Sequence, residues 1–283
     1  MDPISFLSEP LAYSFIQRGM LALILVGGIS AVVGCFVVVR GMSFFGDALS
    51  HAILPGVALS YTASGYVASN LFLGGLGAGI VSALVIAWLT RKVEVKEDSA
   101  IAIVFVTMFA LGIAIVSTQT SYAIDLTHIL FGSINGISQG DLLMVAAMGA
   151  VVLVIIALLY KEFQIISFDL SLGHSLRLPV EVLRISLLLL IALTIVASLQ
   201  AVGIALMLAL LITPAATARL LVKRLHHMIV IASLLGILSG VVGFYASYYL
   251  DIPSGACIVL TTSVLFGLVF LLQSGWNRFR ERQ

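Results

Sequence analysis

Asp47 and His51 are side chains whose types and spacing suit metal binding. They lie in the run 40–59, which otherwise has the composition of a membrane helix. A separation of four residues is about one helical turn, so both side chains are expected on one helix face. An ionisable side chain at bilayer depth is costly and usually faces a bundle interior or a watery path. A carboxylate with an imidazole suits manganese, iron or zinc better than sodium or potassium. The pair therefore predicts a weak, open site on a route for a divalent metal ion.

A structural role for the same residues competes with this interpretation. Asp47 would cap a helix near the cytoplasmic face, and His51 would pack in the bundle with a hydrogen-bond partner. The same-face spacing and the companions Ser43 and Ser50 favour the metal path. Asp125 and His128 form a second pair, three residues apart, for which a solvated outer loop is the favoured interpretation and a role in metal entry or docking is the alternative.

The composition excludes a soluble globular protein. Of the 283 residues, 61% are hydrophobic and 10% are charged, whereas soluble domains carry about a quarter charged residues. The mean hydropathy is +1.20. A net charge of +1 without a basic tract does not indicate binding to nucleic acid.

Apolar runs long enough to cross a bilayer recur along the whole chain. The runs are continuous rather than alternating, which excludes a closed barrel. We therefore expect an all-α polytopic membrane protein with eight or nine spans in one transmembrane domain over 1–283. The candidate spans are 13–39, 44–64, 67–89, 98–117, 141–160, 181–199, 201–221, 227–249 and 255–273. Leu54-Pro55-Gly56 and Ile212-Thr213-Pro214-Ala215 are expected to interrupt their helices, and pairs such as Gly75/Gly79 and Gly236/Gly240 have the spacing of closely packed helices.

Lysine and arginine fall on one side of the nine predicted spans, with Arg18 as the exception. The opposite loops, 64–67, 118–140, 199–202 and 249–254, contain neither residue. By the positive-inside rule the basic side is cytoplasmic, which puts the N-terminus outside and the C-terminus inside. If the first segment only enters the interface, the count is eight.

A cytoplasmic segment at about 161–180 is too short for another span. Asp169 is expected to cap a short helix with apolar positions Leu170, Leu172 and Leu176. Gly173 and Pro179 punctuate this segment. Such an amphipathic helix is either an idle loop or a projection that fits the groove of a partner.

The sequence lacks the motifs of the enzymes that a membrane protein of this size could be. It contains no GxxxxGK[ST] phosphate loop and no HExxH pair. Ser50 and His51 are adjacent, so on a helix they point about 100° apart and cannot form a nucleophile–base hydrogen bond. We therefore expect a transport protein rather than an enzyme.

Three runs resemble the permease subunits of bacterial manganese, zinc and iron ABC importers, and the resemblance covers essentially the whole chain. The first is Arg40-Gly41-Met42-Ser43, Gly46-Asp47-Ala48, Ser50-His51-Ala52 and Leu54-Pro55-Gly56-Val57-Ala58. The second is Ser167-Phe168-Asp169 ahead of the short helix and Leu178-Pro179. The third is Leu211-Ile212-Thr213-Pro214-Ala215-Ala216-Thr217-Ala218.

The resemblance implies a type II ABC importer permease fold in the bacterial cytoplasmic (inner) membrane. Asp47 and His51 would coordinate or gate a transported manganese, zinc or iron ion, and no other cofactor is expected. Phe168, Asp169, Gly173 and Leu176 would belong to a coupling segment that contacts a separate ATPase subunit. The other implied partners are a metal-binding extracytoplasmic solute-binding protein and a second permease subunit, identical or paralogous.

The sequence thus favours a permease subunit that imports a divalent transition metal with energy from a separate ATPase. The alternative is an ion-coupled secondary metal carrier or channel that acts without an ATPase. In either case the imidazole must be neutral to bind metal, so mildly acidic pH is expected to weaken transport.

Overall fold

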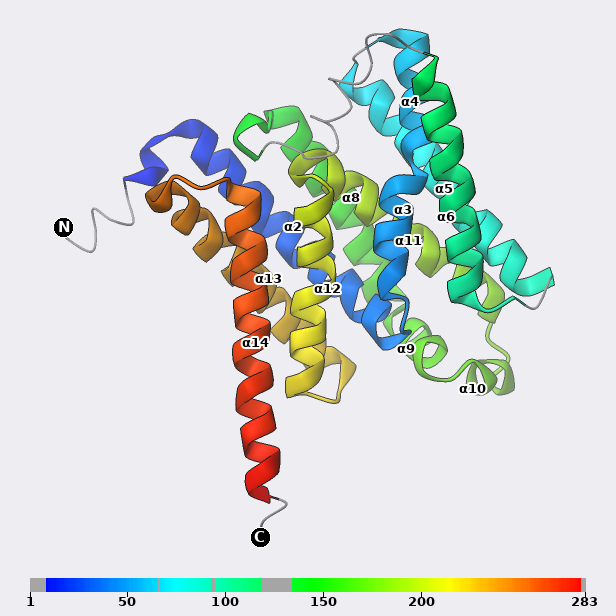
Figure 1. Cartoon of the computed structure of the whole chain (residues 1–283). Coiled ribbons are helices and arrows are strands. Elements are labelled where there is room, and N and C mark those ends of the chain that lie inside the picture. Colours follow the sequence, from blue (N-terminus) through cyan, green and yellow to red (C-terminus); the bar gives the residue numbers. More distant parts are fainter. Residues whose placement is uncertain (1–8, 66, 93–94, 119–133, 281–283) are drawn as a thin grey trace. The chain divides into compact units, whose positions relative to one another are not determined.

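The structure, a computed structural model, describes residues 9–65, 67–92, 95–118 and 134–280, and nearly all of them are helical (Figure 1). The elements are η1 (Pro10–Ala12), α2 (Ser14–Val39), α3 (Ser43–Ala52), α4 (Leu54–Ser64), α5 (Ala68–Lys92), α6 (Glu97–Ser117), η2 (Ile134–Gly136), α8 (Gln139–Leu158), α9 (Tyr160–Phe168), α10 (Leu170–Ser175), α11 (Val180–Val202), α12 (Ile204–Leu221), α13 (Leu225–Leu250) and α14 (Ser254–Arg280).

Eight helices of the described residues are long and apolar enough to cross a membrane. They are α2, α5, α6, α8, α11, α12, α13 and α14, and each coincides with a predicted span to within a few residues. The first predicted span is the full helix Ser14–Val39, so its length allows a complete crossing. The all-α polytopic fold class is confirmed.

The candidate span over 44–64 is not one helix. The chain forms α3 and α4, with a break at Ile53. Pro55 has no amide hydrogen to bond the carbonyl of His51, and its ring crowds the preceding turn. The proline is tolerated because it lies in the first turn of α4, where an amide would have no helical partner. The interruption that Leu54-Pro55-Gly56 predicts is therefore present, directly before these residues.

The second predicted interruption is absent, because α12 continues through Pro214. Pro214 is buried, and Thr217 in the next turn donates its hydroxyl to the carbonyl of Thr213 at 2.7 Å. One lost backbone hydrogen bond is not enough to end a helix that is packed on both sides of the proline.

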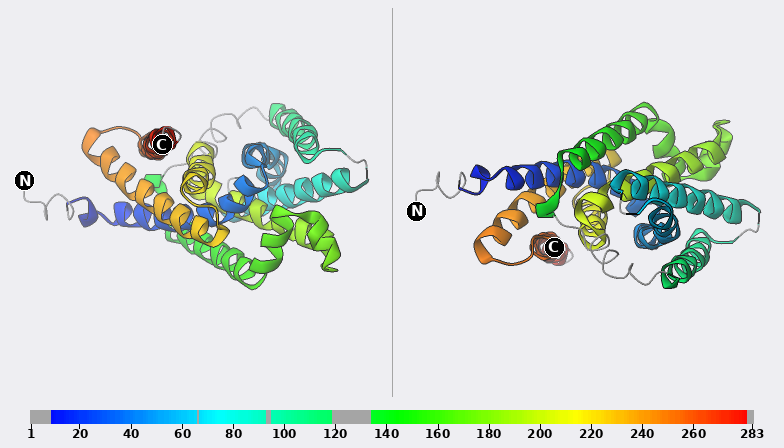
Figure 2. Two further views of the ribbon diagram at one scale, coloured as in Figure 1. Left: turned by 90° about the horizontal axis from the view of Figure 1, so that it is seen from below. Right: turned by 90° about the horizontal axis from the view of Figure 1, so that it is seen from above.

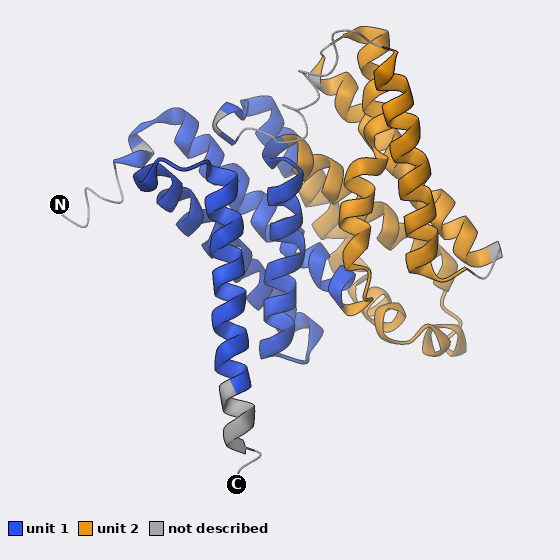
Figure 3. Cartoon of the chain, viewed as in Figure 1, with its two compact units in different colours: residues 1–38, 132–147, 201–283 blue, residues 39–131, 148–200 orange. Residues whose placement is uncertain are grey.

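Contacts divide the chain into two compact units (Figure 3). Unit 1 comprises residues 1–38, 132–147 and 201–283. In it α12, α13 and α14 pack on one another, and Figure 2 shows α12 and α14 nearly end-on beside a sloping α13. Gly27 of α2 faces Gly236 of α13, where a Cβ on Gly236 would lie 2.6 Å from the carbonyl oxygen of Gly27. Small residues allow this close approach of backbones, as the glycine spacing predicted.

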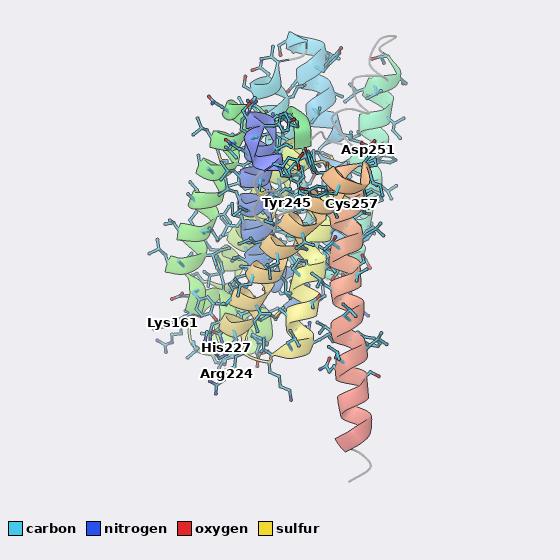
Figure 4. All side chains as sticks on the ribbon, turned by 90° about the vertical axis from the view of Figure 1, so that its left-hand side faces the viewer. Lys161, Arg224, His227, Tyr245, Asp251 and Cys257 are labelled. Atoms are coloured by element: carbon cyan, nitrogen blue, oxygen red, sulfur yellow. The ribbon has the colours of Figure 1, made fainter. Side chains whose placement is uncertain are left out.

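The two ends of α13 differ in charge as the positive-inside pattern requires. Figure 4 shows Arg224 and His227 at the start of the helix and Tyr245 and Asp251 toward its other end. The basic residues lie on the side that the sequence assigns to the cytoplasm.

Unit 2 comprises residues 39–131 and 148–200 and contains every residue of the predicted metal and coupling sites. Here α3 packs on α6, and α4 packs on α5 and α6. Gly56 of α4 and Gly74 of α5 face each other so closely that a Cβ on either would clash with the backbone carbonyl of the other. The break at Ile53 is thereby held against two long helices.

Candidate metal site

The turn before α3 is built by three consecutive residues of the first motif. Arg40 is bound to Glu97 at the start of α6, with one guanidinium nitrogen, Nη2, 3.1 and 3.2 Å from the two carboxylate oxygens. Gly41 adopts φ 74°, a left-handed conformation that other residues rarely take. Met42 is buried, and its carbonyl accepts the amide of Phe45 at 2.9 Å. These residues set where α3 begins and in which direction it runs.

Asp47 and His51 lie on one face of α3, as their spacing predicts. Asp47 Oδ1 is 3.8 Å from His51 Nε2, and 42% of the Asp47 side chain and 28% of the His51 side chain are exposed. The distance is too long for a hydrogen bond, so the carboxylate and the imidazole do not bind each other. The N-cap residue of α3 is Met42, and Asp47 lies in the middle of the helix. A capping role for Asp47 is therefore wrong.

The imidazole of His51 rests against two phenylalanines of α6. Its ring centroid is 5.9 Å from that of Phe105 and 5.5 Å from that of Phe109, in tilted and edge-on arrangements. Phe105 also meets Phe44, which lies ahead of Asp47 on α3, at 5.9 Å. We call Phe44, Phe105 and Phe109 the aromatic wall. His51 Nδ1 is buried and has no hydrogen-bond partner among the described residues.

The two serines expected beside the pair differ in position. Ser50 is fully buried and donates its hydroxyl to the carbonyl of Gly46 at 2.8 Å, so it satisfies the helix and does not extend the polar face. Ser43 is exposed at the first residue of α3. Ser50 is therefore no companion of Asp47 and His51.

The pair supplies two ligands, and the described part of the chain holds no cluster of three or more histidine, cysteine or acidic side chains that could bind a metal. A divalent transition metal in a protein takes four to six ligands. Two partly exposed side chains could therefore make only a transient site, which water or another subunit would have to complete. Such a site can release its ion, as a transport path requires.

The predicted coupling segment forms two short helices, α9 and α10. Asp169 is the N-cap of α10, and its Oδ1 accepts hydrogen bonds from the amides of Ser171 and Leu172 at 2.8 and 3.1 Å. The expected cap is confirmed. Phe168 and Leu176 are 59% and 54% exposed, and Leu170 and Leu172 are also exposed. Leu170 and Leu172 thus give the six-residue helix an exposed apolar face, and Phe168 and Leu176 flank its two ends.

Gly173 lies on the opposite, buried side of α10. A Cβ there would lie 3.0 Å from Val180 Cγ2 of α11, and the carbonyl of Gly173 accepts the amide of Leu178 at 3.1 Å. Gly173 therefore seats α10 on the start of α11. His174 is exposed on the same helix, and Asp125 and His128 lie outside the described residues.

Sequence reasoning missed the aromatic wall and the partner of Arg40. Phenylalanines four residues apart in an apolar run are typical of any membrane helix, so Phe105 and Phe109 carry no signal of their own. The Arg40–Glu97 ion pair joins residues 57 positions apart. The sequence signal that could have predicted this pair is a basic residue at the end of one predicted span and an acidic residue at the start of another.

Comparison with known proteins agrees with this architecture. The family model described as "ABC 3 transport family" matches residues 12–273. The manganese transport system membrane protein MntC of Halalkalibacterium halodurans is 43% identical over 265 residues, which cover 94% of this chain and 89% of the relative. The chelated iron transport system membrane protein YfeD of Yersinia pestis is 38% identical over 279 residues, covering 99% and 92%.

A solved structure has the same fold. A chain of PsaBC from Streptococcus pneumoniae, solved in complex with Fab, superimposes with a TM-score of 0.81 at 36% identity, covering 94% of this chain and 95% of that one. The ABC permease fold implied by the sequence is confirmed, and this is a multi-pass membrane protein. The chain belongs to the ABC 3 transport family.

Proposed function

We propose that this chain is the membrane-spanning permease subunit of an ABC importer for a divalent transition metal, with manganese, iron and zinc as candidate cargoes. The observation that carries the proposal is the Asp47–His51 pair, two free ligands on one face of a short helix. The names of the relatives support the choice of cargo, since they refer to manganese and to chelated iron.

The pair would bind the ion transiently during alternating access. The carboxylate of Asp47 supplies a negative charge, and the imidazole of His51 supplies a nitrogen ligand through Nε2, the atom that faces Asp47. A second permease subunit, identical or paralogous, would bring a second such pair, so that a dimer could offer four ligands. The aromatic wall limits the directions in which the His51 ring can turn.

The other partners would act on the two faces of the membrane. A separate ATPase subunit would receive the exposed face of α10, with Phe168 and Leu176 in contact and Asp169 and Gly173 holding the helix in place. ATP hydrolysis would take place on that subunit, since this chain has no phosphate loop. The complex would lie in the bacterial cytoplasmic (inner) membrane. An extracytoplasmic solute-binding protein would deliver the metal to its outer side.

Uptake of radioactive manganese by a reconstituted complex tests this proposal. The complex contains this chain, its ATPase subunit and its binding protein in liposomes, with zinc and iron as competing ions. We expect uptake that needs ATP and stops when the catalytic residues of the ATPase are replaced. Continued uptake with the inactive ATPase would instead support the secondary carrier, and absence of uptake of all three metals would contradict metal import.

A further inference from the structure

Arg40 is a buried charge whose hydrogen bonding is incomplete. Its side chain is 5% exposed, and Nη2 alone contacts Glu97. Nη1 is buried without a hydrogen-bond partner among the described residues. Burial lowers the pKa of Arg40, and the nearby Glu97 carboxylate counteracts that effect. A buried ion pair of this kind contributes little net stability, because desolvation of the charges offsets their attraction. Its placement therefore calls for another explanation.

The ion pair joins the two helices that form the candidate metal site. Arg40 precedes α3, which carries Asp47 and His51, and Glu97 is the first residue of α6. Two and three turns further along, α6 carries Phe105 and Phe109, which contact the His51 ring. The Arg40–Glu97 contact thus holds the helix ends from which the ligands and the aromatic wall extend.

A second arginine, on the helix that follows α10, ties that helix to α5. Arg184 of α11 donates from Nη2 to the carbonyl of Ala87 at 3.0 Å and to Thr90 Oγ1 at 2.6 Å, both on α5. Glu181 lies 3.7 Å from the same nitrogen. Helix α5 in turn packs on α3 and on α6, the two helices that the Arg40–Glu97 pair joins.

The start of α11 is tied directly to α10. Gly173 packs on Val180, and the amide of Leu178 donates to the carbonyl of Gly173. The amide of Leu183 continues the helix by donating to the carbonyl of Pro179 at 3.0 Å. A displacement of α10 must therefore move the first turns of α11, and with them Arg184.

We propose that Arg40 and Glu97 are positioning residues that set the spacing of α3 and α6 at the metal pair, and that Arg184 transmits the movement of α10 to them. The inference rests on the proposed function, because α10 moves only if an ATPase subunit binds it. Displacement of Arg184 would shift α5, and with it the contacts that α5 makes with α3 and α6. The spacing of His51 and the aromatic wall then changes with the state of the ATPase.

The test compares four variants with wild type in the reconstituted complex: Arg40→Gln, Glu97→Gln, the reversal Arg40→Glu with Glu97→Arg, and Arg184→Gln. Arg18→Gln is the control, because the hydrogen bond of Arg18 goes to the carbonyl of Ser14 in its own helix. Manganese uptake and ATP hydrolysis are measured together as functions of metal concentration.

We expect Arg40→Gln and Glu97→Gln each to raise the KM for manganese and to lower the metal moved per ATP by at least about tenfold. This is the size of effect expected when one charged hydrogen bond is lost. The reversal should recover part of both quantities. Arg184→Gln should leave KM near wild type and lower the metal moved per ATP, because it leaves the Arg40–Glu97 pair intact. If these residues were only structural, the variants would reduce membrane abundance. They would not separate an effect on KM from an effect on the metal moved per ATP.

The positioning role would be overturned if both single variants had the wild-type KM and moved as much metal per ATP as wild type. It would also be overturned if the reversal recovered neither quantity relative to the single variants. If neither single variant reaches the membrane, Arg184→Gln decides, and a wild-type ratio in that variant overturns the transmission. Failure of the wild-type complex to take up metal contradicts the proposed function instead.

Discussion

Asp47 Oδ1 and His51 Nε2 lie 3.8 Å apart on one face of α3, and each is left free by the other. The imidazole also contacts Phe105 and Phe109 of α6. Nε2 of the ring thus lies toward a carboxylate, and the ring packs on apolar side chains. This relationship determines what replacement of each residue should do.

Asp47→Asn and His51→Gln should each reduce metal uptake by at least about tenfold, because the first removes the negative charge and the second the imidazole nitrogen of a proposed weak site. Exposed residues away from the pair provide the controls Asp98→Asn and His226→Gln. Uptake is measured at equal membrane abundance. Wild-type uptake in both pair variants would exclude them from the ion path.

Phe105→Ala should raise the KM for the metal about two- to tenfold while both ligands remain. The His51 ring gains rotational freedom that binding must remove, at a cost of about 0.5–1.5 kcal/mol. Phe270→Ala is the matched control, since Phe270 is exposed on α14 and contacts Phe266. An unchanged KM would show that the aromatic wall does not restrain the imidazole.

Asp169→Ala should weaken coupling to the ATPase, since an N-cap contributes about 1 kcal/mol to its helix. Asparagine is an equally good N-cap, so Asp169→Asn should retain stimulation of ATP hydrolysis by the loaded binding protein. The measurement is ATPase activity of the purified complex. Equal loss in both variants would mean that the carboxylate itself contacts the partner.

Gly74→Ala should lower the thermal unfolding temperature of the chain in detergent, because the new methyl group clashes with Ser60 and with the backbone of Gly56. Overpacking of this kind costs about 1–3 kcal/mol. Gly77→Ala lies one turn away on the same helix with open space around it, and should be neutral or slightly stabilising. Equal unfolding temperatures would contradict the close contact of α4 and α5.

The sequence predicted the features that depend on local spacing. One helical turn brought Asp47 and His51 together, Pro55 broke its helix, and Asp169 capped α10. Pro214 has the same local chemistry as Pro55, yet α12 continues through it. The difference is position, because Pro55 lies in the first turn of a helix and Pro214 in the middle of one with neighbours on both sides.

Features that depend on contacts between distant segments could not be predicted. Hydropathy marks the span that contains Phe105 and Phe109, but does not show which ring meets a histidine on another helix. Ser50 was expected to face the path, but its hydroxyl returns to the carbonyl of Gly46. Which face of a membrane helix is buried follows from its neighbours, and the apolar composition of long helices such as α2, α6 and α8 hardly differs from face to face.

The break at Ile53 also affects how the ligands can move. It leaves α3 with ten residues between the left-handed turn at Gly41 and the start of α4. Helices shorter than about 12–15 residues have little stability of their own in isolation and depend on their surroundings. Reorienting α3 as a unit therefore disturbs few backbone hydrogen bonds, whereas tilting a continuous helix over 44–64 would shift the whole crossing. At the proposed metal pair the backbone could therefore move in a short segment, without movement of the long helices around it.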